Sequence, residues 1–164
     1  MVTIKQLKYI PTEMYNNPIN YNKIGLYTYD INNTNIRTFA EKIIRKSKYK
    51  NIVEYACLTS EYHITVANDQ PVGGIDEHVD MIDEDMGIIT LIIYPLQKKS
   101  GSGGELCIHN SNNIIEIPFN DINDKHIAKY ILFDDTIVHS VNPIINGTRE
   151  AFVFNYEKFE NSIN

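Results

Sequence analysis

The sequence has few cysteines, no tryptophan and no long apolar run. Its two cysteines, Cys57 and Cys107, lie far apart and fit neither a zinc-ligand spacing nor a disulfide framework. The opening residues lack the apolar core of a secretion signal. The longest apolar stretch, residues 87–96, is too short to span a bilayer. These absences predict a cytoplasmic protein of a reducing compartment without a membrane partner.

Positive charge is also in short supply. The chain carries 15 Lys and Arg against 21 Asp and Glu, for a net charge of −6. Nucleic-acid binding needs a basic footprint, so this balance argues against a nucleic-acid partner. The one basic cluster, residues 37–50, falls in the later turns of a predicted helix, where cations suit the negative helix end. We therefore interpret it as a solvated helix face.

The length of 164 residues predicts a single domain, residues 1–164, and 43% hydrophobic residues are enough for a core. Residues before 33 predict an irregular arm with short extended pieces. One helix begins at Asn33 or Thr34, because apolar residues then recur at helical spacing, namely Ile36, Phe39, Ala40, Ile43 and Ile44.

Short strands follow the helix. Alternating or continuous apolar segments predict eight of them, at 53–59, 62–67, 87–96, 105–109, 114–117, 129–133, 136–141 and 149–156. Turn residues separate several of these segments, at 100–104, 111–113, 134–135 and 146–147. This pattern predicts a mainly β sandwich or barrel with the helix packed outside it.

The chemistry concentrates in the tripeptide His78-Val79-Asp80. In an extended segment, residues two apart project from the same face, so one imidazole and one carboxylate converge. His139, which follows an apolar strand and a two-Asp turn, is the best candidate for a third ligand. Two His and one carboxylate with open positions form the facial triad of non-haem Fe(II) oxygenases.

Arg149 lies ten residues after His139 and opens a strand. A buried guanidinium at this point would bind the far end of a dicarboxylate through a bidentate pair. Taken alone, Arg149 would be better interpreted as one partner of an ordinary surface salt bridge.

Together these residues resemble the 2-oxoglutarate/Fe(II) dioxygenases, and among them the prolyl-hydroxylase-like branch. The order and spacing of the matching segments carry the resemblance over residues 62–156: His78-Val79-Asp80, Thr90–Leu96, Gly103–Leu106, Phe133, His139–Pro143 and Gly147-Thr148-Arg149. The resemblance implies a double-stranded β-helix, or jelly roll.

The resemblance also implies roles. His78, Asp80 and His139 would ligate Fe(II), and Arg149 would pair with the C5 carboxylate of the cosubstrate 2-oxoglutarate. Tyr94 would either join Arg149 on that carboxylate or be a plain core aromatic. The implied reaction hydroxylates a side chain of a protein or peptide, first of all proline, and releases succinate and CO2, with ascorbate as a further candidate cofactor.

At two positions the sequence departs from the residues that the resembling family commonly carries, and these departures weaken the assignment of a substrate. Asn68 stands where many carry a Tyr facing the cosubstrate, and Asn155 where many carry an aromatic residue. A nucleic-acid demethylase of the same family is one alternative, but those enzymes carry a second Arg in the last strand and none follows Arg149 here. A non-catalytic binding module on the same fold is the other.

The segment 67–77, with Pro71 and two glycines, predicts a loop that borders the site and acts as a substrate lid. The acidic residues that crowd His78 predict a solvated loop in preference to a second metal site. The remaining histidines lack a partner at ligand spacing and predict no direct role, namely His63, His109 and His126.

Overall fold

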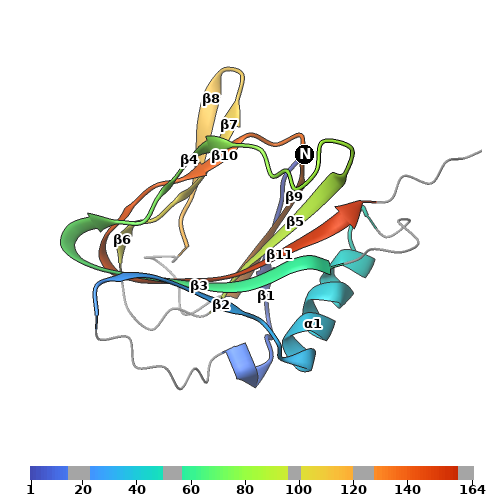
Figure 1. The fold of residues 1–164 in the computed structure, drawn as a ribbon, viewed down its shortest axis with the longest axis horizontal. Coiled ribbons are helices and arrows are strands. Elements are labelled where there is room, and N and C mark those ends of the chain that lie inside the picture. The colour runs from blue at the N-terminus through green and yellow to red at the C-terminus, as the bar shows by residue number, and fades with distance from the viewer. Residues whose placement is uncertain (15–22, 50–56, 96–100, 120–127, 159–164) are drawn as a thin grey trace, which may run out of the picture.

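Two antiparallel sheets lie one over the other in this protein (Figure 1). The computed structural model describes residues 1–14, 23–49, 57–95, 101–119 and 128–158. The large sheet has the order β1 (Thr3–Leu7), β9 (Ala128–Asp134), β5 (Gly87–Tyr94), β11 (Ile144–Lys158), β3 (Cys57–Val72) and β2 (Gly25–Asp30), with β6 (Ser102–Gly103) paired to β11. The small sheet has the order β4 (Ile75–His78), β10 (His139–Val141), β7 (Leu106–Asn110) and β8 (Asn113–Ile117). The predicted mainly β jelly roll is confirmed.

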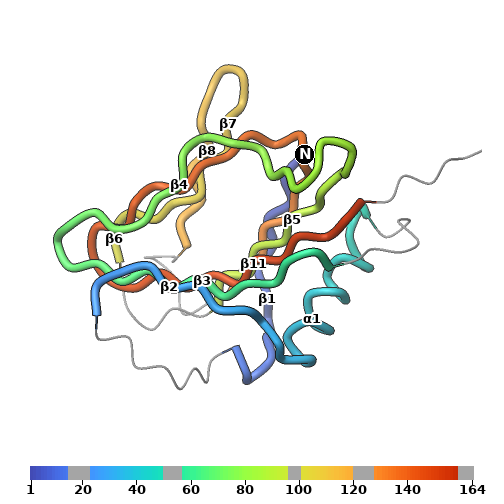
Figure 2. Tube along the Cα trace, viewed as in Figure 1, coloured from blue at the N-terminus to red at the C-terminus, as the bar shows by residue number. Residues whose placement is uncertain are grey.

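The core is divided by the large sheet into two parts. On β5, Ile92 and Tyr94 face the small sheet and pack with its residues, whereas Leu91 and Ile93 pack on the other side. Both faces of this strand are therefore buried, which explains the almost unbroken apolar run in its sequence. The path of the chain in Figure 2 shows β5 and β11 running through the middle of the large sheet.

The predicted helix is α1 (Thr34–Arg45), and it covers the outer side of the large sheet (Figure 1). Asn33 caps it, because its side-chain oxygen accepts a hydrogen bond from the Ile36 amide at 3.1 Å. The buried residues of the helix are those on the predicted apolar face, namely Ile36, Ala40, Ile43 and Ile44. A short 3-10 turn, η1 (Thr12–Met14), lies nearby. No helix among the described residues is long and apolar enough to cross a membrane.

The prediction of an irregular N-terminal arm was wrong in part. β1 and β2 form the two ends of the large sheet, paired with β9 and β3. The sequence predicted short extended pieces here but not their place in the sheet, because edge strands expose one rim and much of one face and their apolar pattern is weak.

The predicted loop at 67–77 was also wrong. β3 continues through Pro71 to Val72, and after Gly73 and Gly74 the chain turns back as β4. Proline is tolerated there because β2 pairs with β3 only up to Val66, so beyond that point one rim of β3 has no β2 partner. Gly73 and Gly74 have φ of 69° and 104°, a conformation that glycine adopts without strain.

Two other boundaries differ from the predictions. The predicted turn at Asn146-Gly147 lies inside β11, where a register shift between Ile144 and Asn146 absorbs the irregularity. The predicted strand at 136–141 is reduced to β10, which begins at His139. Strands 53–59 and 62–67 belong to the single strand β3, although residues 53–56 lie outside the described part of the chain.

Candidate metal centre

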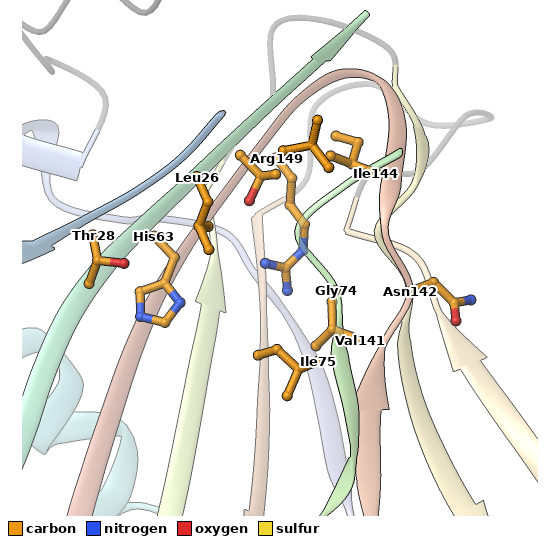
Figure 3. Close-up of a pocket in the computed structure, with 11 residues that line it drawn as sticks. Leu26, Thr28, His63, Gly74, Ile75, Val141, Asn142, Ile144 and Arg149 are labelled. Carbon is orange, nitrogen blue, oxygen red and sulfur yellow. The ribbon is translucent and has the colours of Figure 1, made fainter. Parts of the chain in front are cut away.

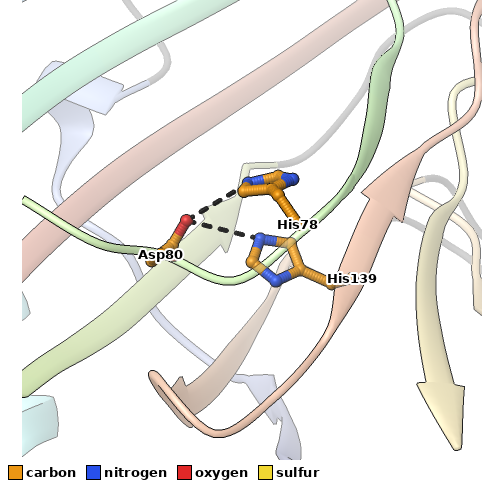
Figure 4. Close-up of side chains that lie close together, drawn as sticks. All are labelled: His78, Asp80 and His139. Atoms are coloured by element: carbon orange, nitrogen blue, oxygen red, sulfur yellow. Dashed lines mark ion pairs between the residues drawn. The ribbon is translucent and has the colours of Figure 1, made fainter.

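The three predicted ligands meet between the ends of β4 and β10 (Figure 4). His78 ends β4, Asp80 follows two residues later, and His139 begins β10 directly opposite His78 in the pairing register. The Oδ1 atom of Asp80 lies 3.3 Å from Nε2 of His78 and 3.5 Å from Nε2 of His139. One ligand atom from each residue lies within 4.8 Å of the other two, which is close enough to hold one metal ion.

The backbone orients both imidazole rings in the same way. Nδ1 of His78 lies 2.8 Å from the carbonyl oxygen of Asp76, and Nδ1 of His139 lies 3.1 Å from that of Ile137. A carbonyl only accepts, so each Nδ1 carries a proton, and each Nε2 faces Asp80. Burial lowers the pKa of His139, which favours the neutral ring that a metal requires.

The second oxygen of Asp80 has its own partner, which sequence reasoning missed. The Thr90 hydroxyl on β5 donates to Oδ2 of Asp80, and the amide nitrogen of Asn155 on β11 donates to the Thr90 oxygen at 2.9 Å. The signal for Thr90 was present in the sequence, because it is the one polar residue within the aliphatic run from Ile88 to Ile93.

Arg149 is buried inside the molecule, with 7% of its surface exposed. Its Nε donates to the carbonyl oxygen of Gly104 at 3.1 Å, and its Nη2 donates to the Tyr94 hydroxyl at 2.8 Å. No Asp or Glu of the described residues lies within ion-pair distance of the guanidinium. The alternative of a surface salt bridge is therefore wrong, and a buried positive charge stands without a carboxylate among the described residues.

Arg149 lines a cavity of about 100 Å³ between the two sheets (Figure 3). Across the cavity from β11 lie Ile75 of β4 and Val141 of β10. Val141 shares a strand face with His139, two residues earlier, and Ile75 pairs with Val141. The cavity of Arg149 is thus walled by the same two strands that carry the histidines.

One face of β5 contacts both the carboxylate of the triad and the guanidinium of Arg149. Thr90 and Tyr94 lie four residues apart on the same face, and they contact Asp80 and Arg149 respectively. Four residues of strand span roughly 13 Å, so the carboxylate of the triad and the guanidinium stand at the two ends of one short stretch of the interior.

The remaining histidines, the acidic segment and Asn68 lie outside the triad. His63 lines the cavity of Arg149, and its Nε2 lies 2.8 Å from Glu61. His109 is 2.8 Å from the Ser140 hydroxyl and takes no part in the triad, and His126 lies outside the described residues. The exposed segment that follows Asp80 agrees with the predicted solvated acidic loop. Asn68 is exposed on β3 opposite Asn146.

The fold and the triad together define a double-stranded β-helix with a 2-His-1-carboxylate group inside it. Solved structures with a similar fold include an oxidoreductase of the 2OG-Fe(II) oxygenase family from Burkholderia pseudomallei. It is 13% identical, with a TM-score of 0.55, over 82% of this chain and 67% of that one. No protein-family model matches the sequence, and neither does any curated protein.

Two prolyl hydroxylases are similar in the same way. One, from Trichoplax adhaerens and in complex with a hypoxia inducible factor peptide fragment, is 17% identical, with a TM-score of 0.58, over 85% of this chain and 66% of that one. The other, a prolyl-4-hydroxylase from Pseudomonas putida, is 11% identical, with a TM-score of 0.52, over 82% and 71%. This chain therefore spans about two thirds of the length of these proteins. The resemblance predicted from the sequence is confirmed as a likeness of fold.

Proposed function

We propose that this protein is a 2-oxoglutarate- and Fe(II)-dependent oxygenase that hydroxylates a side chain of a protein or peptide, with release of succinate and CO2. One observation carries the proposal: Arg149 is a buried cation without a carboxylate partner among the described residues, in a cavity walled in part by the two strands that carry His78 and His139. A buried charge is costly unless it is paired. Its natural counterpart is an anionic ligand that reaches from the metal to Arg149.

The donor set of the triad fits Fe(II). Two neutral imidazole nitrogens and one carboxylate oxygen leave the remaining positions of an octahedral ion open to other ligands. Bound Fe(II) would supply the activation of dioxygen, which the side chains of the protein cannot perform themselves. Asp80 favours hydroxylation over halogenation, because halogenating relatives lack this carboxylate.

The chain's own residues hold the reactants in place. His78, Asp80 and His139 would bind the metal through Nε2, Oδ1 and Nε2, the atoms that already face one another. The two hydrogen bonds of Arg149 use two of its five N–H groups, so three remain for the far carboxylate of 2-oxoglutarate. The Tyr94 hydroxyl, which accepts from Arg149, keeps its own proton for the same carboxylate.

Peptidyl proline is the first candidate substrate. It is supported by the likeness of fold to prolyl hydroxylases, one of which was solved with a bound peptide. The net charge of −6 disfavours the polyanionic substrate of a nucleic-acid demethylase.

The test is an assay of the purified chain with Fe(II), 2-oxoglutarate and dioxygen, with and without ascorbate, on pools of peptides that contain or lack proline. With the wild type we expect succinate to form and the mass of a proline peptide to increase by one oxygen atom. With Asp80→Ala we expect neither product. Loss of a methyl group from a methylated oligonucleotide would instead favour the demethylase. A wild-type chain that binds metal and 2-oxoglutarate but forms no succinate with any pool would contradict the proposal and favour a binding module.

A further inference from the structure

A row of polar side chains crosses three neighbouring strands of the large sheet and ends at Asp80. In the pairing register, Asn155 on β11 lies opposite Thr59 on β3 and opposite Thr90 on β5. The Thr59 hydroxyl donates to the Asn155 side-chain oxygen at 2.7 Å, and the Asn155 amide donates to Thr90 at 2.9 Å. Thr90 then donates to Oδ2 of Asp80.

Asp80, at the end of the row, determines which partner donates and which accepts in each of its hydrogen bonds. An ionised carboxylate only accepts hydrogen bonds, so the single hydroxyl proton of Thr90 belongs to Asp80. Thr90 must then accept from a donor, which is the NH2 group of Asn155, and the oxygen of Asn155 must point to Thr59. The row leaves no freedom for Thr90 to turn away from Asp80.

Burial makes the row costly to disturb. Thr90 is 2% exposed and lies among aliphatic neighbours on β5. A buried hydroxyl without a partner costs free energy, so Thr90 and Asn155 stabilise each other's orientation. The sequence feature that permits this is the Asn at position 155, because its amide group donates to Thr90 and at the same time accepts from Thr59.

We propose that Thr90 and Asn155 are positioning residues for the metal carboxylate, an inference that rests on the proposed metal site. By occupying Oδ2, they leave Asp80 one free oxygen, Oδ1, which is the atom that faces both histidine Nε2 atoms. Asp80 then binds the ion through one oxygen and leaves an additional position for cosubstrate or dioxygen. Removal of partners of this kind, which lie outside the ligands themselves, typically changes metal affinity about 10–100-fold.

The test compares variants of the full chain for binding of Co(II) in the absence of oxygen, followed by titration and by the absorption spectrum of the bound ion. Thr90→Val keeps the size and removes the hydroxyl, whereas Thr90→Ser keeps the hydroxyl. Asn155→Ala removes the donor to Thr90. Thr148→Val, on the opposite face of β11 from Arg149, is the matched control.

We expect Thr90→Val to weaken Co(II) binding about 10–100-fold and to change the spectrum, because Oδ2 becomes free to bind the ion as well. Asn155→Ala should change both quantities in the same direction but less. Thr90→Ser should restore wild-type binding, and Thr148→Val should leave it unchanged.

A folded Thr90→Val variant with wild-type affinity and spectrum would overturn the positioning role, and so would a change equally large in Thr148→Val. If Thr90→Val does not fold, Asn155→Ala decides by the same two readouts. A wild-type chain that binds no Co(II) would overturn the metal site itself, and the positioning role with it, which separates that failure from the failure of the inference.

Discussion

Both histidines of the triad depend on a carbonyl oxygen two residues earlier in the chain. His78 uses the carbonyl of Asp76 and His139 that of Ile137. This shared local geometry places the proton on Nδ1 and leaves Nε2 free, so the tautomer needs no additional side chain. Residue identity made these histidines candidates, but only the backbone path shows which nitrogen faces the metal position.

Removal of a single ligand should abolish the metal centre and leave the fold intact. His78 is partly exposed and Asp80 lies in a loop after β4, so His78→Ala and Asp80→Ala remove few core contacts. We expect both variants to lose metal binding and turnover while their circular dichroism stays that of the wild type. His109→Ala is the control, because His109 lies outside the triad. Full activity in either ligand variant would contradict the assignment.

Under the proposed function, a substitution of Arg149 should affect cosubstrate binding and leave metal binding intact. Truncating one partner of a buried charged pair costs about 2–5 kcal/mol, so Arg149→Ala should weaken 2-oxoglutarate binding by roughly tens to thousands of fold. Metal affinity should stay unchanged, because Arg149 is not a ligand. Arg149→Lys should recover only part of the loss, since an ammonium cannot reproduce the fork of a guanidinium.

The measurement is calorimetric titration of 2-oxoglutarate into wild type and variants loaded with a redox-inert metal without oxygen. Equal affinities in wild type and Arg149→Ala would remove 2-oxoglutarate from the function and leave a metal-binding jelly roll.

At the scale of secondary structure elements, a partly buried hydrogen bond ties the segment that follows α1 to the large sheet. Tyr49, just after α1, donates its hydroxyl to Oδ2 of Asp134 at the end of β9, at 2.9 Å. Burial raises the pKa of Tyr49. Although burial acts to raise it, hydrogen bonds from Thr136 and Tyr49 hold the pKa of Asp134 below its usual value.

Tyr49→Phe should therefore lower the free energy of unfolding by about 1 kcal/mol at pH 7. A carboxyl with a depressed pKa contributes its full stability above its unfolded-state pKa and loses it as pH falls through the folded-state pKa. The difference between wild type and Tyr49→Phe should thus shrink below about pH 4. Urea denaturation at several pH values measures it, with the exposed Tyr9→Phe as control. A difference that is independent of pH would contradict the role of Asp134.

The elements also show where local sequence signals mislead. Pro71 and the Gly-Gly pair at 73–74 predicted a long loop, yet only the two glycines make the turn. Asn146-Gly147 predicted a turn between two strands but lies within β11, because pairing with β3 continues on both sides of it. Pairing with neighbouring strands outweighed the preferences of single residues in both places.

At the scale of the whole molecule, a bound metal ion and 2-oxoglutarate would together bridge the two sheets. The histidines belong to the small sheet, and Arg149 belongs to the large one. A ligand that binds only the folded chain stabilises it according to its concentration, by about 2.7 kcal/mol at 100 times its dissociation constant.

We therefore expect Mn(II) to raise the thermal midpoint and 2-oxoglutarate to raise it further, by several degrees in all. Asp80→Ala should lose both effects, and Arg149→Ala should keep the effect of the metal and lose that of 2-oxoglutarate. Chelation of the metal should return the wild type to its starting midpoint. Differential scanning fluorimetry measures these changes, and a 2-oxoglutarate effect that persists in Arg149→Ala would contradict the bridging site.

The sequence by itself determined the ligand types, the helix and the apolar strands of the core. His78, Asp80, His139 and Arg149 could be chosen from residue type, order and spacing, because the chemistry of a facial triad and of a dicarboxylate site demands those groups. Helical and alternating apolar patterns are local, so they could be read without knowledge of the fold.

Only the tertiary structure decided which of these residues meet and what supports them. The register of β10 against β4 brings His139 opposite His78, and the register of β11 against β5 and β3 joins Thr59, Asn155 and Thr90 into one row. Strand pairing joins residues from distant parts of the chain, and its register follows from the packing of both sheets together. No local pattern in the sequence contains that information.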